Sequence, residues 1–225
     1  MNLDPNELSK WNCILEPKTN GINTYSGLYI GDIDCAKDQY LLQKLQIRAV
    51  LSVIDYPEIN LPESYIHSKI SIPDSEDQSL LDHFPMCFDF IDENRKHTNV
   101  MVHCYAGISR SATIILGYLM QHFEWNFDRA YQILWCLRKQ IQPNEGFIKQ
   151  LRVYEQIQKK QQNIENFDYK KTNNNQQQEN RQNQFLKQIE QEIEERQKNL
   201  EILKQKYKQI QNTKLISQEQ SKIVL

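Results

Sequence analysis

A short turn between an expected strand and an expected helix constrains this chain more than any other feature. The run "VMVH" (100–103) is apolar and β-branched, whereas "SATIILGYLM" (111–120) is apolar at helical spacing. The residues between them, "CYAGISR" (104–110), are mostly small or polar, with a cysteine at one end and an arginine at the other. A strand that passes so directly into a helix predicts a tight loop at the helix N-terminus.

This loop has the chemistry of an anion-binding site. The amides that we expect to turn toward its centre are those of Tyr105, Ala106, Gly107, Ile108, Ser109 and Arg110. The N-terminus of the helix adds about half a positive charge in the same direction, which favours both a bound phosphate and a thiolate on Cys104. Because the thiolate is the nucleophilic form of cysteine, the sequence predicts that Cys104 is a nucleophile at neutral pH.

Other residues of the loop suit the same chemistry. The planar guanidinium of Arg110 can hold two oxygens of a phosphoryl group, a geometry that lysine lacks. Gly107 and Ala106 leave space for the backbone to approach a ligand. Ser111 places a hydroxyl near the sulfur, where it can stabilise a departing thiolate.

The stretch "HCYAGISRS" resembles the His-Cys-x5-Arg-Ser signature of the cysteine-dependent protein phosphatases. Its form is similar to the HCxAGxSRSAT version of the dual-specificity class, and Ala112 and Thr113 extend the match. The segments "GLYIGDIDCAKD", "IRAVLSVI", "HFPMCFDFID" and "IQPNEGFIKQLRVYE" resemble the corresponding family segments in order and spacing. The resemblance covers residues 24 to 158, and it implies a protein tyrosine phosphatase-like fold in a small, atypical dual-specificity enzyme.

The resemblance also implies a general acid upstream of Cys104. The segment "SIPDSEDQSLLDHF" is similar to the acid loop of the family, with Asp74 at the matching place ten residues before Phe84 and Asp77 as the alternative. An acid is needed because an alkoxide leaves far less readily than a phenolate. By the same resemblance, His103 hydrogen-bonds into the loop, and Asn144 buttresses the phosphate loop or the acid loop.

These residues imply a two-step reaction without a metal or another cofactor. Cys104 attacks phosphorus while Asp74 protonates the leaving oxygen, and water assisted by Asp74 then hydrolyses the cysteinyl-phosphate. The expected substrates are phosphotyrosine, phosphoserine and phosphothreonine in proteins, since no segment resembles the tyrosine-recognition loop of the tyrosine-only enzymes. Lipid substrates are disfavoured because the loop interior "YAGIS" contains no lysine.

Two other functions stay open from the sequence. The chain could be an adaptor that binds phosphoproteins through the loop without turnover, although pseudoenzymes of this family generally lack the cysteine. It could also act on RNA 5′ phosphates or on phosphorylated glycans, because the core reaction is indifferent to the group that bears the phosphate.

Alternating strand and helix patterns predict an α/β domain whose mainly parallel sheet of about five strands is flanked by helices. The strands are expected in segments 27–31, 48–54, 64–72 and 100–103, and the helices in 38–45, 79–94, 109–122, 127–140 and 144–158. The runs "AVLSVI" and "VMVH" are continuously apolar, as is typical of central strands covered on both faces.

The composition divides the chain into further parts. An N-terminal segment (1–23) precedes the catalytic domain (24–158), and a linker rich in Gln and Asn (159–184), which we expect to be disordered, follows it. Residues 185–217 are predicted to form a coiled coil that binds a second copy or another protein, with a solitary solvated helix as the alternative. Residues 218–225 form a C-terminal tail. The heptad positions are Leu186, Ile189, Ile193, Leu200, Leu203, Tyr207 and Ile210, interrupted by Arg196 and Lys214.

Charge and cysteine content limit the remaining classes. Residues 156–225 hold 13 Lys and Arg against 9 Asp and Glu, which leaves 14 against 20 in the body. An acidic body does not favour nucleic-acid binding, and the lack of a long apolar run predicts no membrane association. The five cysteines have no CxxC spacing, so we expect reduced thiols without a zinc site. The expected location is the cytoplasm, with the nucleus as an addition.

Overall fold

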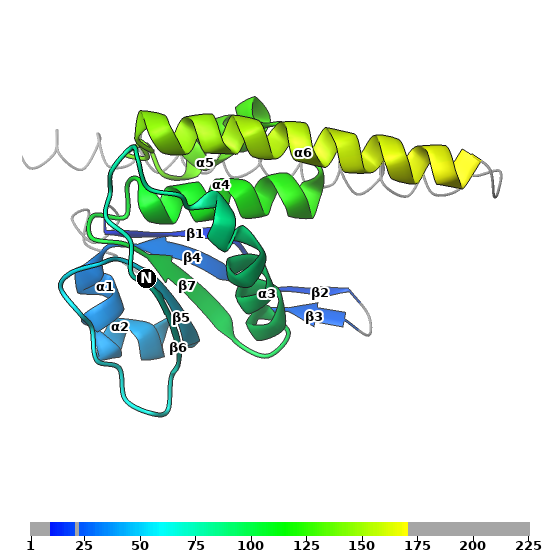
Figure 1. Ribbon diagram of the computed structural model, residues 1–225. Coiled ribbons are helices and arrows are strands. Elements are labelled where there is room, and N and C mark those ends of the chain that lie inside the picture. Colours follow the sequence, from blue (N-terminus) through cyan, green and yellow to red (C-terminus); the bar gives the residue numbers. More distant parts are fainter. Residues whose placement is uncertain (1–9, 21–22, 171–225) are drawn as a thin grey trace, which may run out of the picture. The chain divides into compact units, whose positions relative to one another are not determined.

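A five-stranded sheet forms the centre of the computed structural model, which describes residues 10–20 and 23–170 (Figure 1). The strand order is β1-β4-β7-β5-β6. Strands β4 (Leu28–Gly31), β7 (Asn99–His103), β5 (Ile47–Val53) and β6 (Ile66–Ile70) are parallel, and β1 (Trp11–Leu15) pairs antiparallel with β4. The prediction of a mainly parallel five-stranded sheet flanked by helices is therefore confirmed.

The central strands are buried because both of their faces are covered. All described side chains of β4 and β7 are buried, and β5 is buried except at Arg48. Parallel strands have their carboxyl ends at one edge of the sheet, so β5 and β7 end side by side, with Ser52 paired to His103. The loop after β7 begins at this edge, which is where ligands bind in open α/β sheets.

Helices cover the two faces of the sheet (Figure 1). Helices α1 (Ile33–Lys37) and α2 (Gln39–Lys44) pack on one face, where Ile33 and Leu42 share a core with Val50 and Met101. On the other face, α3 (Phe84–Arg95) and α4 (Arg110–Phe123) contact the central strands. Helix α5 (Phe127–Leu137) packs on α4, and α6 (Glu145–Lys170) follows it.

The structure adds elements that the sequence analysis did not predict. Strand β1 lies within the predicted N-terminal segment 1–23, so the sheet includes residues before the predicted domain start at residue 24. A short hairpin of β2 (Lys18–Asn20) and β3 (Asn23–Tyr25) and the helix α1 were also missed. Helix α1 begins at the point where the Asp32 carboxylate accepts a hydrogen bond from the Cys35 amide, as an N-cap does. The helix was missed because its five residues are too few to show a helical pattern in the sequence.

Three helix boundaries differ from the prediction by three residues or more. Helix α3 begins at Phe84 instead of residue 79, because residues 81–83 form a 3-10 turn. Helix α5 ends at Leu137 instead of residue 140, because Arg138 takes an extended conformation. Helix α6 continues to Lys170 and so occupies the first part of the segment 159–184 that was predicted as a disordered linker. Lys, Gln and Glu, which are good helix formers, are frequent in this part. The rest of that segment, the predicted coiled coil 185–217 and the tail 218–225 lie outside the described residues.

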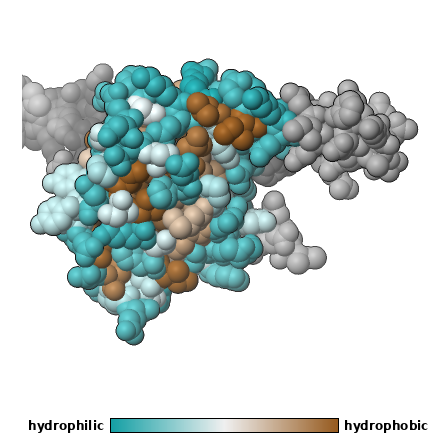
Figure 2. Space-filling model, in the orientation of Figure 1, coloured by the Kyte–Doolittle hydropathy of each residue, from teal (hydrophilic) through white to brown (hydrophobic). Residues whose placement is uncertain are grey.

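The visible surface is mostly polar. In Figure 2, hydrophilic residues prevail on the face shown, and hydrophobic residues appear there in small, separate groups. Within residues 10–20 and 23–170, no helix is both long enough and apolar enough to cross a bilayer.

Candidate active site

Cys104 lies at the end of β7 with its sulfur held by two donors. Its side chain is buried, and Sγ accepts hydrogen bonds from the Gly107 amide at 3.2 Å and from the Ser111 hydroxyl at 3.2 Å. Both donors favour negative charge on the sulfur, because hydrogen bonds to the charged form stabilise that form. The structure thus brings Ser111 to the sulfur, as the sequence predicted.

Residues 104–110, which we call the Cys104 loop, turn their carbonyl groups outward. The carbonyl oxygens of Tyr105, Gly107 and Ile108 accept hydrogen bonds from groups outside the loop: the Ile33 amide, the Arg138 guanidinium and the Gln142 amide, respectively. In a trans peptide the N–H points opposite to the C=O. The amides of Ala106, Ile108 and Ser109 are therefore directed inward, and together with that of Gly107 they supply four of the six amides expected in the anion cradle.

Gly107 is required at its position by conformation and by space. Its φ is 67°, in the region that favours glycine. A Cβ atom there would lie 2.6 Å from the Gly31 carbonyl oxygen and 2.7 Å from a nitrogen of Arg138.

Arg110, the first residue of α4, is buried beside the loop and paired with two carboxylates. Its Nη1 donates to Asp55 Oδ1 at 2.8 Å and to the Ile72 carbonyl at 2.9 Å. Its Nε is buried, lies 3.5 Å from Asp74 Oδ2, and has no hydrogen-bond partner among the described residues. A buried guanidinium nitrogen without an acceptor is suited to bind an oxygen of an anionic ligand.

Asp74 is held against the Cys104 loop by three groups. Its Oδ1 accepts from the Ser109 hydroxyl at 2.7 Å and from the Asn144 side-chain amide at 2.8 Å, while Oδ2 faces Arg110. The backbone amide of Asn144 also donates to the Ser109 hydroxyl at 3.2 Å. Asn144 thus contacts both loops, whereas the alternative acid Asp77 is bonded to Ser75 and makes none of these contacts.

The start of α6 positions residues 73–80, which we call the Asp74 loop. The Gln150 side chain accepts hydrogen bonds from the amides of Leu80 and Leu81 and donates to the Gln78 carbonyl. Gly146 allows close approach, since a Cβ atom there would collide with the backbone of Glu76. The Asp74 loop is therefore fixed to the same helix whose N-cap is Asn144.

His103 lies directly beneath the Cys104 loop. Its Nδ1 is 3.0 Å from the Cys104 carbonyl oxygen, and its Nε2 is 2.6 Å from the Ser52 hydroxyl. Burial lowers the pKa of His103 to about 4, so the imidazole is neutral at physiological pH.

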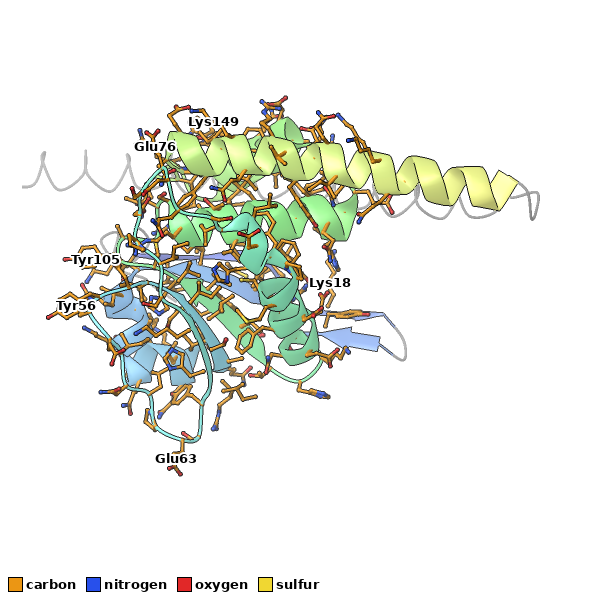
Figure 3. The ribbon with its side chains drawn as sticks, viewed as in Figure 1. Lys18, Tyr56, Glu63, Glu76, Tyr105 and Lys149 are labelled. Atoms are coloured by element: carbon orange, nitrogen blue, oxygen red, sulfur yellow. The ribbon has the colours of Figure 1, made fainter. Side chains whose placement is uncertain are left out.

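Two exposed aromatic residues lie at the same edge of the sheet as the Cys104 loop. Tyr105 is 58% exposed and Tyr56 is 78% exposed, and Figure 3 shows both pointing outward on the same side of the domain. They come from the loops that follow β7 and β5, so they lie at the edge of the sheet where the Cys104 loop begins.

The sequence analysis missed three residues that support the site. Asp55 pairs with Arg110, Ser52 bonds His103, and the buried Arg138 donates from Nε to the Gly107 carbonyl at 2.8 Å. Asp55 and Ser52 could have been suspected, because polar residues at the carboxyl end of a buried parallel strand lie near the site edge. Arg138 had no such signal, since it appears in the sequence as the polar end of a helix.

Within the described parts of the chain, no group of three or more His, Cys, Asp and Glu residues is arranged to hold a metal ion. The arrangement instead joins one thiol, one guanidinium and one carboxylate around a cradle of amides. These groups can attack a phosphoryl group, bind its oxygens and protonate a leaving oxygen.

Comparison with known proteins agrees with this chemistry. A family model described as the dual specificity phosphatase catalytic domain matches residues 28–157. Dual specificity protein phosphatase 19 of Mus musculus is 38% identical over 129 residues, which cover 57% of this chain and 59% of the relative. Dual specificity protein phosphatase 1 of Arabidopsis thaliana is 35% identical over 126 residues, which cover 56% of this chain and 64% of the relative. The chain thus spans less than two thirds of the length of these curated relatives.

A solved structure shares the fold. The crystal structure of DUSP15 aligns with a TM-score of 0.55 and 28% sequence identity, and the alignment covers 59% of this chain and 88% of that one. The expected protein tyrosine phosphatase-like architecture is therefore confirmed.

Proposed function

The chain belongs to the dual specificity phosphatase family, and on this premise we propose that it removes phosphate from phosphotyrosine, phosphoserine and phosphothreonine residues of proteins. One observation carries the proposal: the Cys104 sulfur, the Arg110 guanidinium and the Asp74 carboxylate meet at one cradle of inward-facing amides.

In the first step the Cys104 thiolate attacks phosphorus in line. The S–P bond forms as the bond to the leaving oxygen breaks, and the protonated Asp74 gives its proton to that oxygen. The amides of the Cys104 loop and the guanidinium of Arg110 stabilise the charge on the equatorial oxygens. Asp74 is supported in this role by its hydrogen bonds to Ser109 and Asn144, which fix its position beside the loop.

In the second step water hydrolyses the cysteinyl-phosphate. The Asp74 carboxylate takes a proton from the water, whose oxygen bonds to phosphorus, and Cys104 leaves as a thiolate. Hydrogen bonds from Ser111 and Gly107 stabilise that thiolate, so both donors contribute to breaking the S–P bond.

Arg110 has a guanidinium nitrogen available for the phosphoryl group. In the structure Arg110 Nη1 is engaged by Asp55 and by the Ile72 carbonyl, whereas Nε lacks an acceptor. A bound phosphate would supply one to Nε, and the carboxylates of Asp55 and Asp74 keep the guanidinium at the cradle until the substrate arrives.

The test is hydrolysis of a phosphotyrosine peptide, a phosphothreonine peptide and a small aryl phosphate against pH, with a chelator present. We expect Cys104→Ser to abolish turnover of all three. Asp74→Asn should lower turnover of the phosphothreonine peptide about 100-fold or more, and that of the aryl phosphate less, because a phenolate leaves without full protonation.

Asp77→Asn is the matched control, since Asp77 lies on the same loop but makes no contact with Arg110 or Ser109. It should keep turnover within about two-fold of the wild type, because surface changes away from the reacting groups have small effects. If the wild-type protein binds the phosphopeptides but turns over none of the three substrates, the result would contradict phosphatase activity and favour the adaptor function.

A further inference from the structure

A chain of three polar side chains crosses the sheet from its edge to the Cys104 loop. His67 lies on the edge strand β6, Ser52 on β5 and His103 on β7. The Ser52 hydroxyl is 2.7 Å from His67 Nε2 and 2.6 Å from His103 Nε2, and His103 Nδ1 is 3.0 Å from the Cys104 carbonyl oxygen. Ser52 and His103 are completely buried, whereas His67 is exposed.

The donors and acceptors of this chain can be assigned by elimination. A carbonyl oxygen only accepts, so His103 carries its proton on Nδ1. Because His103 is buried and neutral, its Nε2 then has no proton and accepts from the single hydroxyl proton of Ser52. Ser52 has no further proton to give, so His67 Nε2 must be the donor to Ser52.

We propose that His67 and Ser52 are positioning residues of the active site, which fix the tautomer and ring orientation of His103 and through it the start of the Cys104 loop. The inference rests on the proposed phosphatase chemistry only in that this loop is the reacting one. It assigns a role to an exposed residue two strands away from β7, the strand that ends directly before Cys104.

The tautomer matters because the alternative form of His103 would lose the hydrogen bond to the Cys104 carbonyl oxygen. If Nε2 carried the proton, it would donate to Ser52, and the lone pair of Nδ1 would face the carbonyl oxygen of Cys104. Two acceptors at 3.0 Å repel each other, so the peptide after Cys104 would move. The donor on His67 opposes this, because a Ser52 hydroxyl that accepted from both rings would have no acceptor among the three side chains for its own proton.

The charged groups around these three side chains do not change the direction of their hydrogen bonds. Lys69 faces His67 from the same strand, while Asp32 at the start of α1 and Arg110 at the start of α4 face His103. Partial burial of the ring edge that faces Ser52 lowers the pKa of His67, with Lys69 adding to the effect. The required tautomer of neutral His67 and the imidazolium both carry a proton on Nε2, so the donation to Ser52 persists across the pH range of the reaction.

A plainer reading is that Ser52 only satisfies the buried His103, and that His67 contacts Ser52 by chance at the surface. The two readings differ for substitutions at His67, whose exposed ring can be replaced without opening a cavity. Glutamine can present an amide N–H near the position of Nε2, whereas methionine has a similar length and no donor. His67→Gln and His67→Met are thus a matched pair.

The experiment measures how fast iodoacetamide alkylates Cys104 at pH 6.0, followed by mass spectrometry of the Cys104 peptide, together with turnover of a small aryl phosphate. The donors around Sγ hold the thiolate only while the loop keeps its conformation. We expect His67→Met to slow alkylation about three- to ten-fold, because only the thiolate form of Cys104 reacts with iodoacetamide. His67→Gln should stay within about two-fold of the wild type.

His97→Met is the control for the loss of an exposed histidine, because His97 precedes β7 at the opposite end of that strand. It should not change the alkylation rate. Ser52→Ala, if it folds, should slow alkylation at least as much as His67→Met. The inference fails if His67→Met reacts like the wild type, if His67→Gln is slowed equally, or if His97→Met is slowed as well.

The two readouts separate this inference from the proposed function. If the wild-type protein turns over the aryl phosphate and His67→Met shows normal alkylation and normal turnover, the proposed function stands. The positioning role of His67 is then refuted. If the wild-type protein shows no turnover, the proposed function is refuted, and the alkylation rates still decide whether His67 positions the loop.

Discussion

Cys104 depends on neighbours that act through the backbone as much as through side chains. Gly107 gives its amide to the sulfur and its carbonyl to Arg138, and its positive φ lets one residue face both ways. The Ser111 hydroxyl adds the second donor from the first turn of α4. At this scale the reactivity of the thiol is a property of the Cys104 loop and not of the cysteine alone.

His103 makes the stability of the protein sensitive to acid. Burial lowers its pKa from 6.5 to about 4. Between these values the unfolded chain binds a proton that the folded chain does not, so the free energy of unfolding falls as the pH falls. From pH 7.5 to 5.0 this group alone should lower it by about 2 kcal/mol.

The measurement is urea denaturation at both pH values for the wild type and His103→Gln, which cannot titrate. The wild type should lose about 2 kcal/mol more than the variant over this interval. Other histidines with a lowered pKa, such as His122, titrate in both proteins and cancel. His97→Gln should keep the wild-type difference, and equal losses in the wild type and His103→Gln would refute the assignment.

At the scale of elements, β1 and the Cys104 loop are joined through one side chain. The Arg138 guanidinium is almost completely buried and donates to the Gly107 carbonyl, to Asn12 Oδ1 at 2.7 Å and to the Lys10 carbonyl at 3.4 Å. A buried charge that loses its partners is costly. Strand β1 therefore stabilises the loop as well as the edge of the sheet.

Removal of residues 1–15 should lower the free energy of unfolding by at least about 3 kcal/mol, because it exposes β4 and leaves Arg138 with fewer acceptors. Turnover of an aryl phosphate should fall with it. Removal of residues 1–9 is the control and should change neither quantity measurably, since both acceptors remain. Unfolding curves from urea and initial rates test this, and a stable, fully active 16–225 protein would contradict it.

The sequence predicted the elements whose patterns are local. The apolar runs of β5 and β7 and the helical spacing after Ser111 sufficed, because buried central strands and amphipathic helices have distinct periods. Strand β1 was missed because "WNCIL" is only half-buried and its pairing with β4 is irregular between Cys13 and Leu15. Its place in the sheet depends on a partner further along the chain.

The candidate site divides in the same way. The contiguous loop from Cys104 to Ser111 could be interpreted from spacing, and Asp74 and Asn144 from a family resemblance. Asp55 could have been suspected from its place after β5, although its partner Arg110 lies 55 positions away. The roles of Arg138 and His67 could not, because Arg138 acts on Gly107, 31 positions away, and His67 reaches His103 only through Ser52. From the sequence alone, a charged residue of this kind is ordinarily interpreted as a solvated surface residue.

At the scale of the whole molecule, every group of the proposed reaction lies before residue 159. Asn144, at the start of α6, is the last residue that contacts Asp74, and Gln150 is the last that holds the Asp74 loop. The compact unit of the domain ends at Ile164. We therefore expect the remaining residues to be separable from the chemistry, and their heptad pattern predicts a coiled coil with a second copy or with another protein.

A second copy of this chain is the partner that we expect for residues 185–217. Apolar residues at heptad spacing from Leu186 to Ile210 can form a buried seam only with another helix. Sedimentation should therefore show a dimer for the full chain and a monomer after truncation at Lys170, while turnover of an aryl phosphate stays within a few-fold. In the full chain, Leu200→Lys places a charge in the seam and should give a monomer, whereas Gln191→Lys lies off the heptad positions and should leave the dimer intact. Monomers for both the full chain and the truncated chain would show that the seam does not bind its own copy.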